Sequence, residues 1–244
     1  MKRFFSPQVN KNSTLISLAP EESHYLKNVL RLEKGEKVSI FNGKDPEEFI
    51  AIIKESSKQV KLEVIEIKKD SIKKNYFLAL AFGIIKGKKT DFIIQKATEI
   101  GIDALIPFES ERTIVNINRG EKEKKRILRW EKIIIGANKQ CERNVVPKIT
   151  SLKSFSDLIS MTADYDSVLV ASPGKNKQKL KPIAEKNKKI LLVVGPEGGF
   201  SEKELAFFKE TGSEFFSLGT SILRAETAAI VASAIVKCKI EGLI

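Results

Sequence analysis

The spacing of apolar residues changes about a third of the way along the chain. In the first part, apolar and charged residues alternate over short stretches, a pattern typical of strands with one solvent-facing side. The predicted strands cover residues 39–41, 48–54 and 60–67. A helix is predicted from Pro20, where a proline and two acids favour a first turn, to Gly35. The charged stretch 68–74 ends this part, so we expect a small, mostly β domain over residues 1–71.

From residue 72 to residue 244, unbroken apolar runs alternate with helical patterns. The predicted elements are strand 76–82, helix 89–101, strand 104–107, helix 121–138, strand 167–171 and helix 177–187. Alternating strands and helices indicate a parallel sheet, and unbroken apolar strands suit a sheet covered on both faces. The chain therefore predicts an α/β second domain over residues 72–244.

Two strand-loop-helix units follow within residues 190–228. In the first, an apolar strand runs into Gly-Pro-Glu-Gly-Gly at residues 195–199, where Gly198 and Gly199 can take positive φ and let a ligand approach the backbone. Ser201 and Glu204 fit a capping box that starts the next helix. Since open α/β sheets bind ligands at the carboxyl ends of their strands, we expect the two loops to form one pocket; a tight turn without a ligand is an equally good interpretation.

The second loop, residues 218–224, leads into a helix rich in small side chains. Arg224 and Glu226 stand at the start of that helix. An arginine there opposes the helix dipole unless an anion or carboxylate holds it. A surface ion pair between the two side chains is the simpler interpretation, and a functional pair is the alternative.

Composition narrows the classes of function. A formal net charge of +12 and a pI near 9.5 favour a polyanionic partner, first nucleic acid and then an anionic membrane surface, against the alternative of a lysine-rich solvated surface. No apolar run approaches the roughly 20 residues of a membrane span. Cys141 and Cys238 predict neither a zinc site nor a disulfide framework, so we expect no metal and a cytoplasmic protein. Dinucleotide and triphosphate fingerprints are absent.

Several basic or polar residues are candidates for RNA contact. Lys86, Lys88 and Lys89 follow a strand in a glycine-containing loop that can hold phosphates or be a solvated turn. His24, the only histidine, lies in a helix pattern of the first domain, where we favour a structural or RNA-positioning role over catalysis. The basic stretch 122–129 is interpreted mainly as a solvated helix face with possible RNA contact.

The chain resembles the bacterial RsmE-type methyltransferases of small-subunit ribosomal RNA, members of the SPOUT superfamily. The residues that carry the resemblance are 24–31 (HYLKNVLR), 95–101 (QKATEIG), Glu111 with Arg112, Gln140 with Arg143, 195–199 (GPEGG), Leu218 with Gly219, and 222–228 (ILRAETA). They stand in the family's order and cover most of the chain. Ser221 departs from the pattern, because arginine is usual at that position.

The resemblance implies a PUA-like β-barrel for RNA over residues 1–71 and a SPOUT α/β domain over residues 72–244. The last loops of the second domain are expected to form a trefoil knot around S-adenosylmethionine. It further implies a homodimer that methylates N3 of a uridine in 16S ribosomal RNA or in the small ribosomal subunit. Arginine stays protonated, so Arg224, and after it Arg143, are candidates to stabilise negative charge on the uracil carbonyls, and Glu226 is the candidate base.

The remaining site residues are expected from these motifs, from the glycine turns and from the basic loop after residue 83. Expected to bind the cofactor are Gly195, Pro196, Glu197, Gly198, Gly199, Leu218, Gly219, Ile222 and Leu223. Expected to bind RNA are His24, Arg31, Lys86, Lys88, Lys96, Arg112 and Gln140. Two alternatives remain open: a non-catalytic RNA-binding ribosome-assembly factor of the same fold, which Ser221 would fit, and a methyltransferase for another RNA position.

Overall fold

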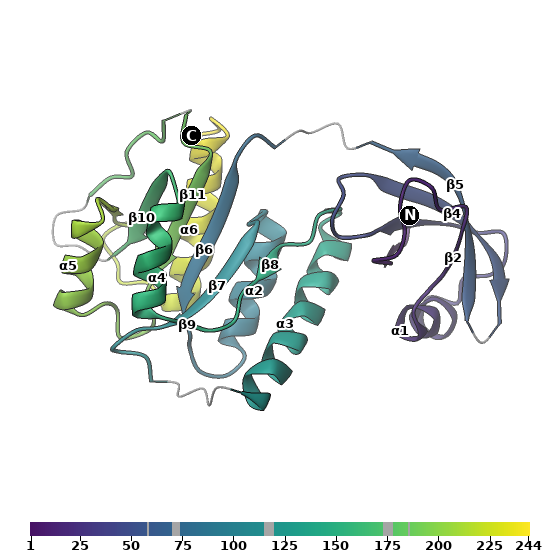
Figure 1. The fold of residues 1–244 in the computed structure, drawn as a ribbon, viewed down its shortest axis with the longest axis horizontal. Coiled ribbons are helices and arrows are strands. Elements are labelled where there is room, and N and C mark those ends of the chain that lie inside the picture. Colours follow the sequence, from purple (N-terminus) through teal and green to yellow (C-terminus); the bar gives the residue numbers. More distant parts are fainter. Residues whose placement is uncertain (58, 70–73, 115–119, 173–177, 185) are drawn as a thin grey trace. The chain divides into compact units, whose positions relative to one another are not determined.

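The computed structural model describes residues 1–57, 59–69, 74–114, 120–172, 178–184 and 186–244 (Figure 1). The chain divides into two compact units, which we call the first and second units. The first contains residues 1–73 and 138–146, and the second contains residues 74–137 and 147–244. The first unit thus includes a segment, 138–146, that the sequence pattern assigned to the second domain.

The first unit is built on a five-stranded sheet. Its elements are β1 (Arg3–Phe5), β2 (Leu15–Ser17), α1 (Pro20–His24), a π-helix (Tyr25–Val29), β3 (Lys37–Phe41), β4 (Glu48–Ser56) and β5 (Val60–Lys68). The strand order is β1-β3-β4-β5-β2, with β1 parallel to β3 and every other pair antiparallel. Register shifts at Ile50/Ala51 and Ile53/Glu55 mark bulges, which bend and twist a sheet. The expected barrel is therefore a curled half-barrel around an apolar core.

The helix predicted from Pro20 to Gly35 is much shorter than expected. It is α-helical only to His24 and continues as one π-helical turn, in which the Leu30 amide donates to the Tyr25 carbonyl (3.0 Å). Arg31 then has a φ of 54°, a conformation incompatible with a continuing right-handed helix. The apolar spacing of this segment instead reflects Leu26, which is buried in the core of the first unit.

The second unit contains a seven-stranded sheet in which every pairing is parallel. Its elements are β6 (Phe77–Gly83), α2 (Lys89–Ile100), β7 (Ala104–Glu109), α3 (Glu121–Gln140, whose last three residues belong to the first unit), β8 (Lys148–Ile149), β9 (Lys153–Ser154), α4 (Phe155–Met161), a 3-10 turn (Thr162–Asp164), β10 (Ser167–Ala171), β11 (Lys189–Val194), α5 (Glu202–Glu210), β12 (Glu214–Phe216) and α6 (Ala225–Ile240). The strand order is β12-β10-β11-β6-β7-β8, and β9 pairs with β7 beside β8. The predicted parallel sheet is confirmed.

Helices cover both faces of this sheet, as its unbroken apolar strands require (Figure 1). On one face, Leu158 of α4 and Phe208 of α5 pack on alternate residues of the central strands, such as Val170 and Val193. On the other face, α6 contacts β6 and β11, and α2 packs against α6. Ala229 and Ala232 of α6 are fully buried, so small side chains allow this close packing.

The helix predicted over 177–187 is wrong where the chain is described. Residues 178–184 and 186–187 contain no helix, while 177 and 185 lie outside the described residues. Pro182 lacks the amide hydrogen that a helix interior needs, and lysines leave too few apolar residues for a buried face. Instead, the Gln178 carbonyl accepts a hydrogen bond from the Ser217 amide (2.8 Å), which ties this segment to the chain after β12.

Candidate active site

The loop after β11 is anchored by a buried carboxylate. The predicted capping box is confirmed: the Glu204 amide donates to Ser201 Oγ (3.3 Å), and the Ser201 amide donates to Glu204 Oε2 (2.8 Å). The Glu111 amide donates to the other oxygen, Glu204 Oε1 (2.9 Å). Both carboxylate oxygens are thus paired in a side chain that is only 4% exposed. The start of α5 is therefore fixed to the segment that follows β7.

Glycines let the backbone pack closely around this loop. A Cβ on Gly83, the last residue of β6, would lie 2.4 Å from the Pro196 nitrogen, and one on Gly198 would lie 2.9 Å from Arg112 Cβ. Arg112 Nη1 also donates to the Gly198 carbonyl (3.2 Å). Of the two glycines that can take positive φ at this turn, only Gly199 does, at 66°. Gly198 is needed for space instead.

A cavity lies at the carboxyl ends of β10 and β12. We call it the strand-end cavity. It is lined by Ala171, Ser172, Ser217, Leu218, Gly219, Ser221, Leu223 and Ala228. Strand ends are where open α/β sheets bind ligands. Three of the predicted cofactor-binding residues, Leu218, Gly219 and Leu223, contribute to the lining.

The other predicted cofactor-binding residues do not line this cavity. Ile222 is 86% exposed. Residues 195–199 follow β11, and β10 separates β11 from β12 in the sheet. The two loops expected to form one pocket therefore follow strands that are not neighbours. Spacing along the sequence could not reveal this, because strand order is set by the crossovers.

Five lining residues of the strand-end cavity were not among the predicted cofactor-binding residues. Ala171 ends β10 and Ser172 follows it, Ser217 follows β12, Ser221 lies in the last loop, and Ala228 lies on α6. Ala171 and Ser172 could have been predicted, because strand 167–171 was expected from the sequence and open α/β sheets bind ligands at the carboxyl ends of their strands. The small side chain of Ala228 gave no comparable signal.

Helix α6 begins directly after the cavity-lining loop. Arg224 is its N-cap residue, with an extended backbone and an exposed side chain. The simple ion pair with Glu226 is not formed: in the described part of the chain, no carboxylate pairs with the Arg224 guanidinium. Glu226 has a side chain only 13% exposed, and its Oε1 lies 3.7 Å from Lys89 Nζ. Its second oxygen, Oε2, is buried with no hydrogen-bond partner among the described residues.

The unpartnered oxygen of Glu226 is the main electrostatic feature of this region. A buried acceptor without a donor costs about 1–3 kcal/mol, so such groups in folded proteins call for a specific explanation. Lys89 compensates the charge only in part, because its Nζ also lies 3.2 Å from Glu197 Oε1. One ammonium thus links the loop after β11 to the first turn of α6. The arrangement leaves the hydrogen-bonding capacity of one buried carboxylate oxygen unused among the described residues.

The four RNA-binding candidates of the second unit differ in the ion pairs and hydrogen bonds that their side chains already make. Lys86 and Lys88 are exposed in the loop between β6 and α2. Lys96 is paired with Glu99 on the same helix (2.8 Å), and Arg112 is bonded to the loop after β11. Lys86 and Lys88 are therefore the better placed of the four for an added anion.

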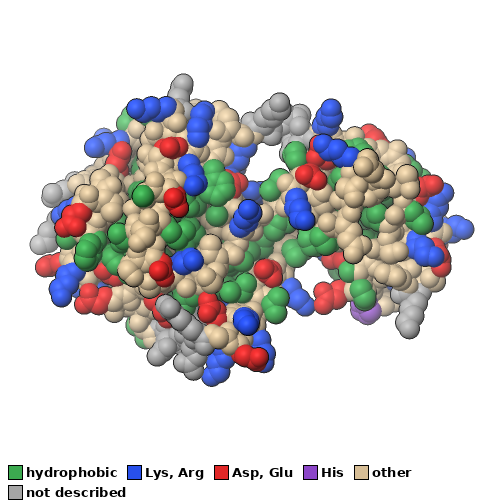
Figure 2. Space-filling view, viewed as in Figure 1, with side chains coloured by type: hydrophobic (Ala, Val, Ile, Leu, Met, Phe, Trp, Pro, Cys, Tyr) green, Lys and Arg blue, Asp and Glu red, His purple; other side chains and the backbone are tan. Residues whose placement is uncertain are grey.

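Four other candidates lie in the first unit. His24 is exposed at the end of α1, Arg31 is exposed with its positive φ, and Gln140 is exposed at the end of α3. Arg143, a candidate catalytic residue, also belongs to this unit, whereas Arg224 and Glu226 belong to the second. Figure 2 shows Lys and Arg side chains spread over both units on the face drawn. Overall charge therefore does not by itself locate an RNA site.

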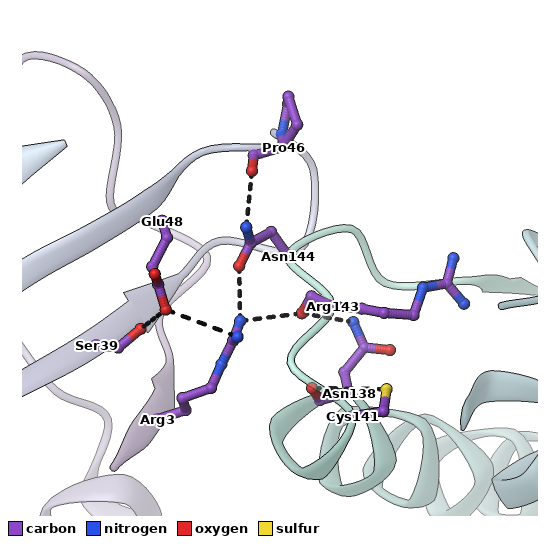
Figure 3. A network of polar contacts seen from close by, with 8 residues as sticks. All are labelled: Arg3, Ser39, Pro46, Glu48, Asn138, Cys141, Arg143 and Asn144. Atoms are coloured by element: carbon purple, nitrogen blue, oxygen red, sulfur yellow. Dashed lines mark hydrogen bonds and ion pairs between the residues drawn. The ribbon is translucent and has the colours of Figure 1, made fainter. Parts of the chain in front are cut away.

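A buried arginine ties segment 138–146 to the first sheet (Figure 3). Arg3 Nη2 donates to Asn144 Oδ1 (2.6 Å) and to the Arg143 carbonyl (3.2 Å), while Nη1 lies 3.7 Å from Glu48 Oε1. Asn144 in turn donates to the Pro46 carbonyl (2.7 Å). The Arg143 side chain extends away from this network. The backbone of the segment is thus fixed while the Arg143 guanidinium points elsewhere.

Replacing Arg3 with lysine is expected to destabilise the first unit by about 1 kcal/mol, the typical net contribution of a hydrogen bond. A lysine keeps the charge but lacks the planar fork that reaches Asn144 and the Arg143 carbonyl together. Urea unfolding followed by circular dichroism measures the change. Lys2→Arg, the reverse exchange at the exposed neighbouring position, is the control. Equal stability of the two variants would show that the fork is unimportant.

Three further findings limit the chemistry of the described residues. They contain no group of three or more His, Cys, Asp or Glu side chains arranged to hold a metal ion. None of their helices combines the length and apolarity that crossing a bilayer requires. Cys141 and Cys238 are both free thiols, one in each unit.

Comparison with known proteins identifies the two parts of the chain. A family profile described as an RNA methyltransferase domain matches residues 72–237, and one described as an RNA methyltransferase PUA domain matches residues 18–73. The chain is 32% identical to ribosomal RNA small subunit methyltransferase E of Bacillus subtilis over 253 residues, covering 100% of this chain and 98% of the relative.

Solved structures agree with this. A putative methyltransferase from Legionella pneumophila in complex with the cofactor SAM has a TM-score of 0.89 and 32% identity, covering 97% of each chain. Methyltransferase E from Neisseria gonorrhoeae, bound to S-adenosyl methionine, has a TM-score of 0.88 and 29% identity, again covering 97% of each chain. The predicted fold class, a SPOUT-type parallel sheet with a PUA-like domain, is confirmed. The chain belongs to the ribosomal RNA small subunit methyltransferase E family.

Proposed function

We propose that this protein methylates N3 of a uridine in 16S ribosomal RNA, with S-adenosylmethionine as methyl donor. One juxtaposition carries the proposal. The strand-end cavity is bordered by Leu223 and Ala228, and between them in the chain stands Glu226 with its buried, unpartnered oxygen. A ligand cavity and a carboxylate oxygen without a hydrogen-bond donor among the described residues, both at the start of α6, are parts that N-methylation requires.

The strand-end cavity fits the cofactor chemically. Leu218, Leu223, Ala171 and Ala228 offer apolar surface for an adenine ring, and serine hydroxyls and backbone groups offer polar contacts. Gly219 has a φ of 121°, and no atom lies within 4 Å of where its Cβ would be, so its backbone is accessible. We assign cofactor binding to Leu218, Gly219 and Leu223, and place the knot at the loops after β11 and β12. When bound, S-adenosylmethionine supplies a methyl group on a positively charged sulfur.

The residues at the start of α6 supply the remaining chemistry. N3 of uridine carries a proton on its pairing edge, so the base must be presented unpaired. Glu226, directly or through a water, accepts that proton through its unpartnered oxygen. As the proton leaves, negative charge spreads to the uracil carbonyl oxygens, and the Arg224 guanidinium, free of any carboxylate among the described residues, is available to stabilise it. Arg143 is the second candidate for that task.

The same proposal covers partners and location. The first unit binds ribosomal RNA or the small subunit through its exposed polar residues, among them His24 and Arg31. The second unit adds Lys86 and Lys88. The protein acts as a homodimer in the cytoplasm, and its chemistry uses no metal ion.

Calorimetry tests the cofactor assignment. S-adenosylmethionine and S-adenosylhomocysteine are expected to bind the full-length protein with one site per chain. Leu223→Asp, which puts a charge into the lining, should remove that binding, whereas Ile222→Asp, at the exposed neighbouring position, should preserve it. Binding that survives Leu223→Asp would move the cofactor out of the cavity.

Mass spectrometry of ribosomal RNA nucleosides tests the reaction itself. N3-methyluridine should be present in 16S RNA from cells that carry the gene and absent after its deletion. Loss of a different methylated nucleoside would identify another target position. An unchanged set of nucleosides would favour the non-catalytic RNA-binding factor, a function for which Ser221 in the cavity lining is the structural argument.

A further inference from the structure

A second, larger cavity lies in the second unit between the start of α2 and the middle of α3. We call it the α2-α3 pocket. It is lined by Ile85, Gly87, Lys88, Thr90, Asp91, Arg126, Arg129 and Trp130. It shares no lining residue with the strand-end cavity. Of its lining residues, the proposed function uses only Lys88, as an RNA contact.

The α2-α3 pocket carries excess positive charge. Three cations, Lys88, Arg126 and Arg129, face one acid, Asp91, which leaves a formal balance of +2. Asp91 is already occupied: Oδ2 pairs with Arg129, and Oδ1 accepts a hydrogen bond from the Trp130 indole (3.2 Å). Among the described residues, Lys88 and Arg126 have no ion pair. Their charge is therefore available to an anion.

The pocket is also held in shape. Thr90 Oγ1 donates to the Ile85 carbonyl (3.0 Å) and accepts from the Ile85 amide (3.3 Å), which closes the loop that carries Lys88. On the other wall, the Arg126 guanidinium lies 6.0 Å from the centre of the Trp130 ring. The loop before α2 and the helix α3 thus hold Lys88 and Arg126 on two walls of the α2-α3 pocket. Guanidinium and ammonium groups so placed suit phosphate oxygens.

We propose that the α2-α3 pocket binds a backbone phosphate of the RNA substrate. The loop 84–88 follows β6, and in a parallel sheet all carboxyl ends lie at one edge. The strand order places β6 two strands from β10 and three from β12. At about 4.8 Å per strand, the end of β6 lies roughly 10–15 Å along the sheet from the ends of β10 and β12, a separation that one strand of RNA can span. The assignment of the phosphate to RNA rests on the proposed function. The binding of a phosphate rests only on the residues of the pocket.

Trp130 gives a direct test, because it is the only tryptophan of the chain and lines the pocket. Full-length protein is titrated with inorganic phosphate and with a uridine-containing single-stranded RNA while tryptophan emission is recorded, with chloride matching the ionic strength. Saturable changes are expected with both ligands. Arg126→Gln is expected to weaken both by about 10-fold. It should also reduce the salt slope of RNA binding by about one.

Lys125→Gln is the matched control, since Lys125 is an exposed neighbour on α3 that does not line the pocket. If both variants lose affinity equally, only overall charge matters and the proposal is overturned. A response to inorganic phosphate but not to RNA would overturn the RNA assignment. Lys88→Gln repeats the test from the loop before α2 if Arg126→Gln fails to fold.

Calorimetry with S-adenosylmethionine on the same samples separates the two proposals. A variant that binds the cofactor normally but RNA weakly supports the pocket. A wild-type protein that shows the tryptophan response but makes no methylated uridine contradicts the proposed function and leaves the pocket standing.

Discussion

Replacing Glu226 with glutamine is expected to lower the rate of methyl transfer by about 100-fold or more, the usual contribution of a positioned proton acceptor. Glutamine has nearly the shape of glutamate but cannot take up the N3 proton. Binding of S-adenosylmethionine should persist, because Glu226 does not line the strand-end cavity. The loss is therefore expected in the maximal rate and not in cofactor affinity.

The surroundings of Glu226 explain why the substitution should leave the fold intact. Its Oε2 has no hydrogen-bond partner among the described residues, so an amide in that place removes no hydrogen bond. Its Oε1 is 3.7 Å from Lys89 Nζ, and that lysine, 42% exposed, keeps Glu197 at 3.2 Å as a second partner. A half-exposed ion pair contributes only a few tenths to about 1 kcal/mol. A large loss of rate with a small loss of stability is the signature of a chemical role.

Single-turnover methylation at saturating cofactor measures the effect. Glu202→Gln is the matched control, because Glu202 is an exposed acid in the first turn of α5, as Glu226 is an acid in the first turn of α6. Arg224→Ala, run in parallel, tests the charge-stabilising role and is expected to slow the reaction with Glu226 in place. If Glu226→Gln matches the wild-type rate, Glu226 is not the acceptor.

Local sequence signals predicted much of this region. The Ser201-Glu204 capping box forms as expected, because both of its bonds join residues three apart. The strand before it and the helix from Ala225 were expected from apolar runs and small side chains, and both are present. The parallel sheet followed from alternation of strands and helices. These features depend on short-range chemistry that the sequence displays directly.

Features that depend on long-range packing were not predicted. The spacing of apolar residues could not predict that β10 lies between β11 and β12. Because of this strand order, residues 195–199 do not line the strand-end cavity. Segment 138–146 joins the first unit through Arg3, more than a hundred residues earlier. The Lys89-Glu226 pair likewise joins residues far apart in the chain. Such contacts arise only when the crossovers bring the elements together.

Gly83→Ala is expected to destabilise the second unit by about 1–3 kcal/mol, the usual cost of overpacking. The added methyl would lie 2.4 Å from the Pro196 nitrogen, 2.6 Å from its Cδ and 2.9 Å from its Cα. These atoms belong to backbone and a rigid ring, so no rotamer change can relieve the clash. The loop after β11 must move away from the end of β6.

Thermal unfolding should show a fall of roughly 2–4 °C for each kcal/mol lost. Gly136→Ala is the control: this glycine lies within α3, its Cβ would meet nothing within 4 Å, and alanine there should stabilise by about 0.5–1 kcal/mol. Changes in stability of opposite sign for the two variants would attribute the effect to the contact with Pro196, and changes of equal sign would refute that explanation.

The cofactor affinity of the Gly83→Ala variant tests where the cofactor binds. Because the displaced loop carries residues 195–199, unchanged affinity would confine the cofactor to the strand-end cavity, and weakened affinity would return that loop to the binding site.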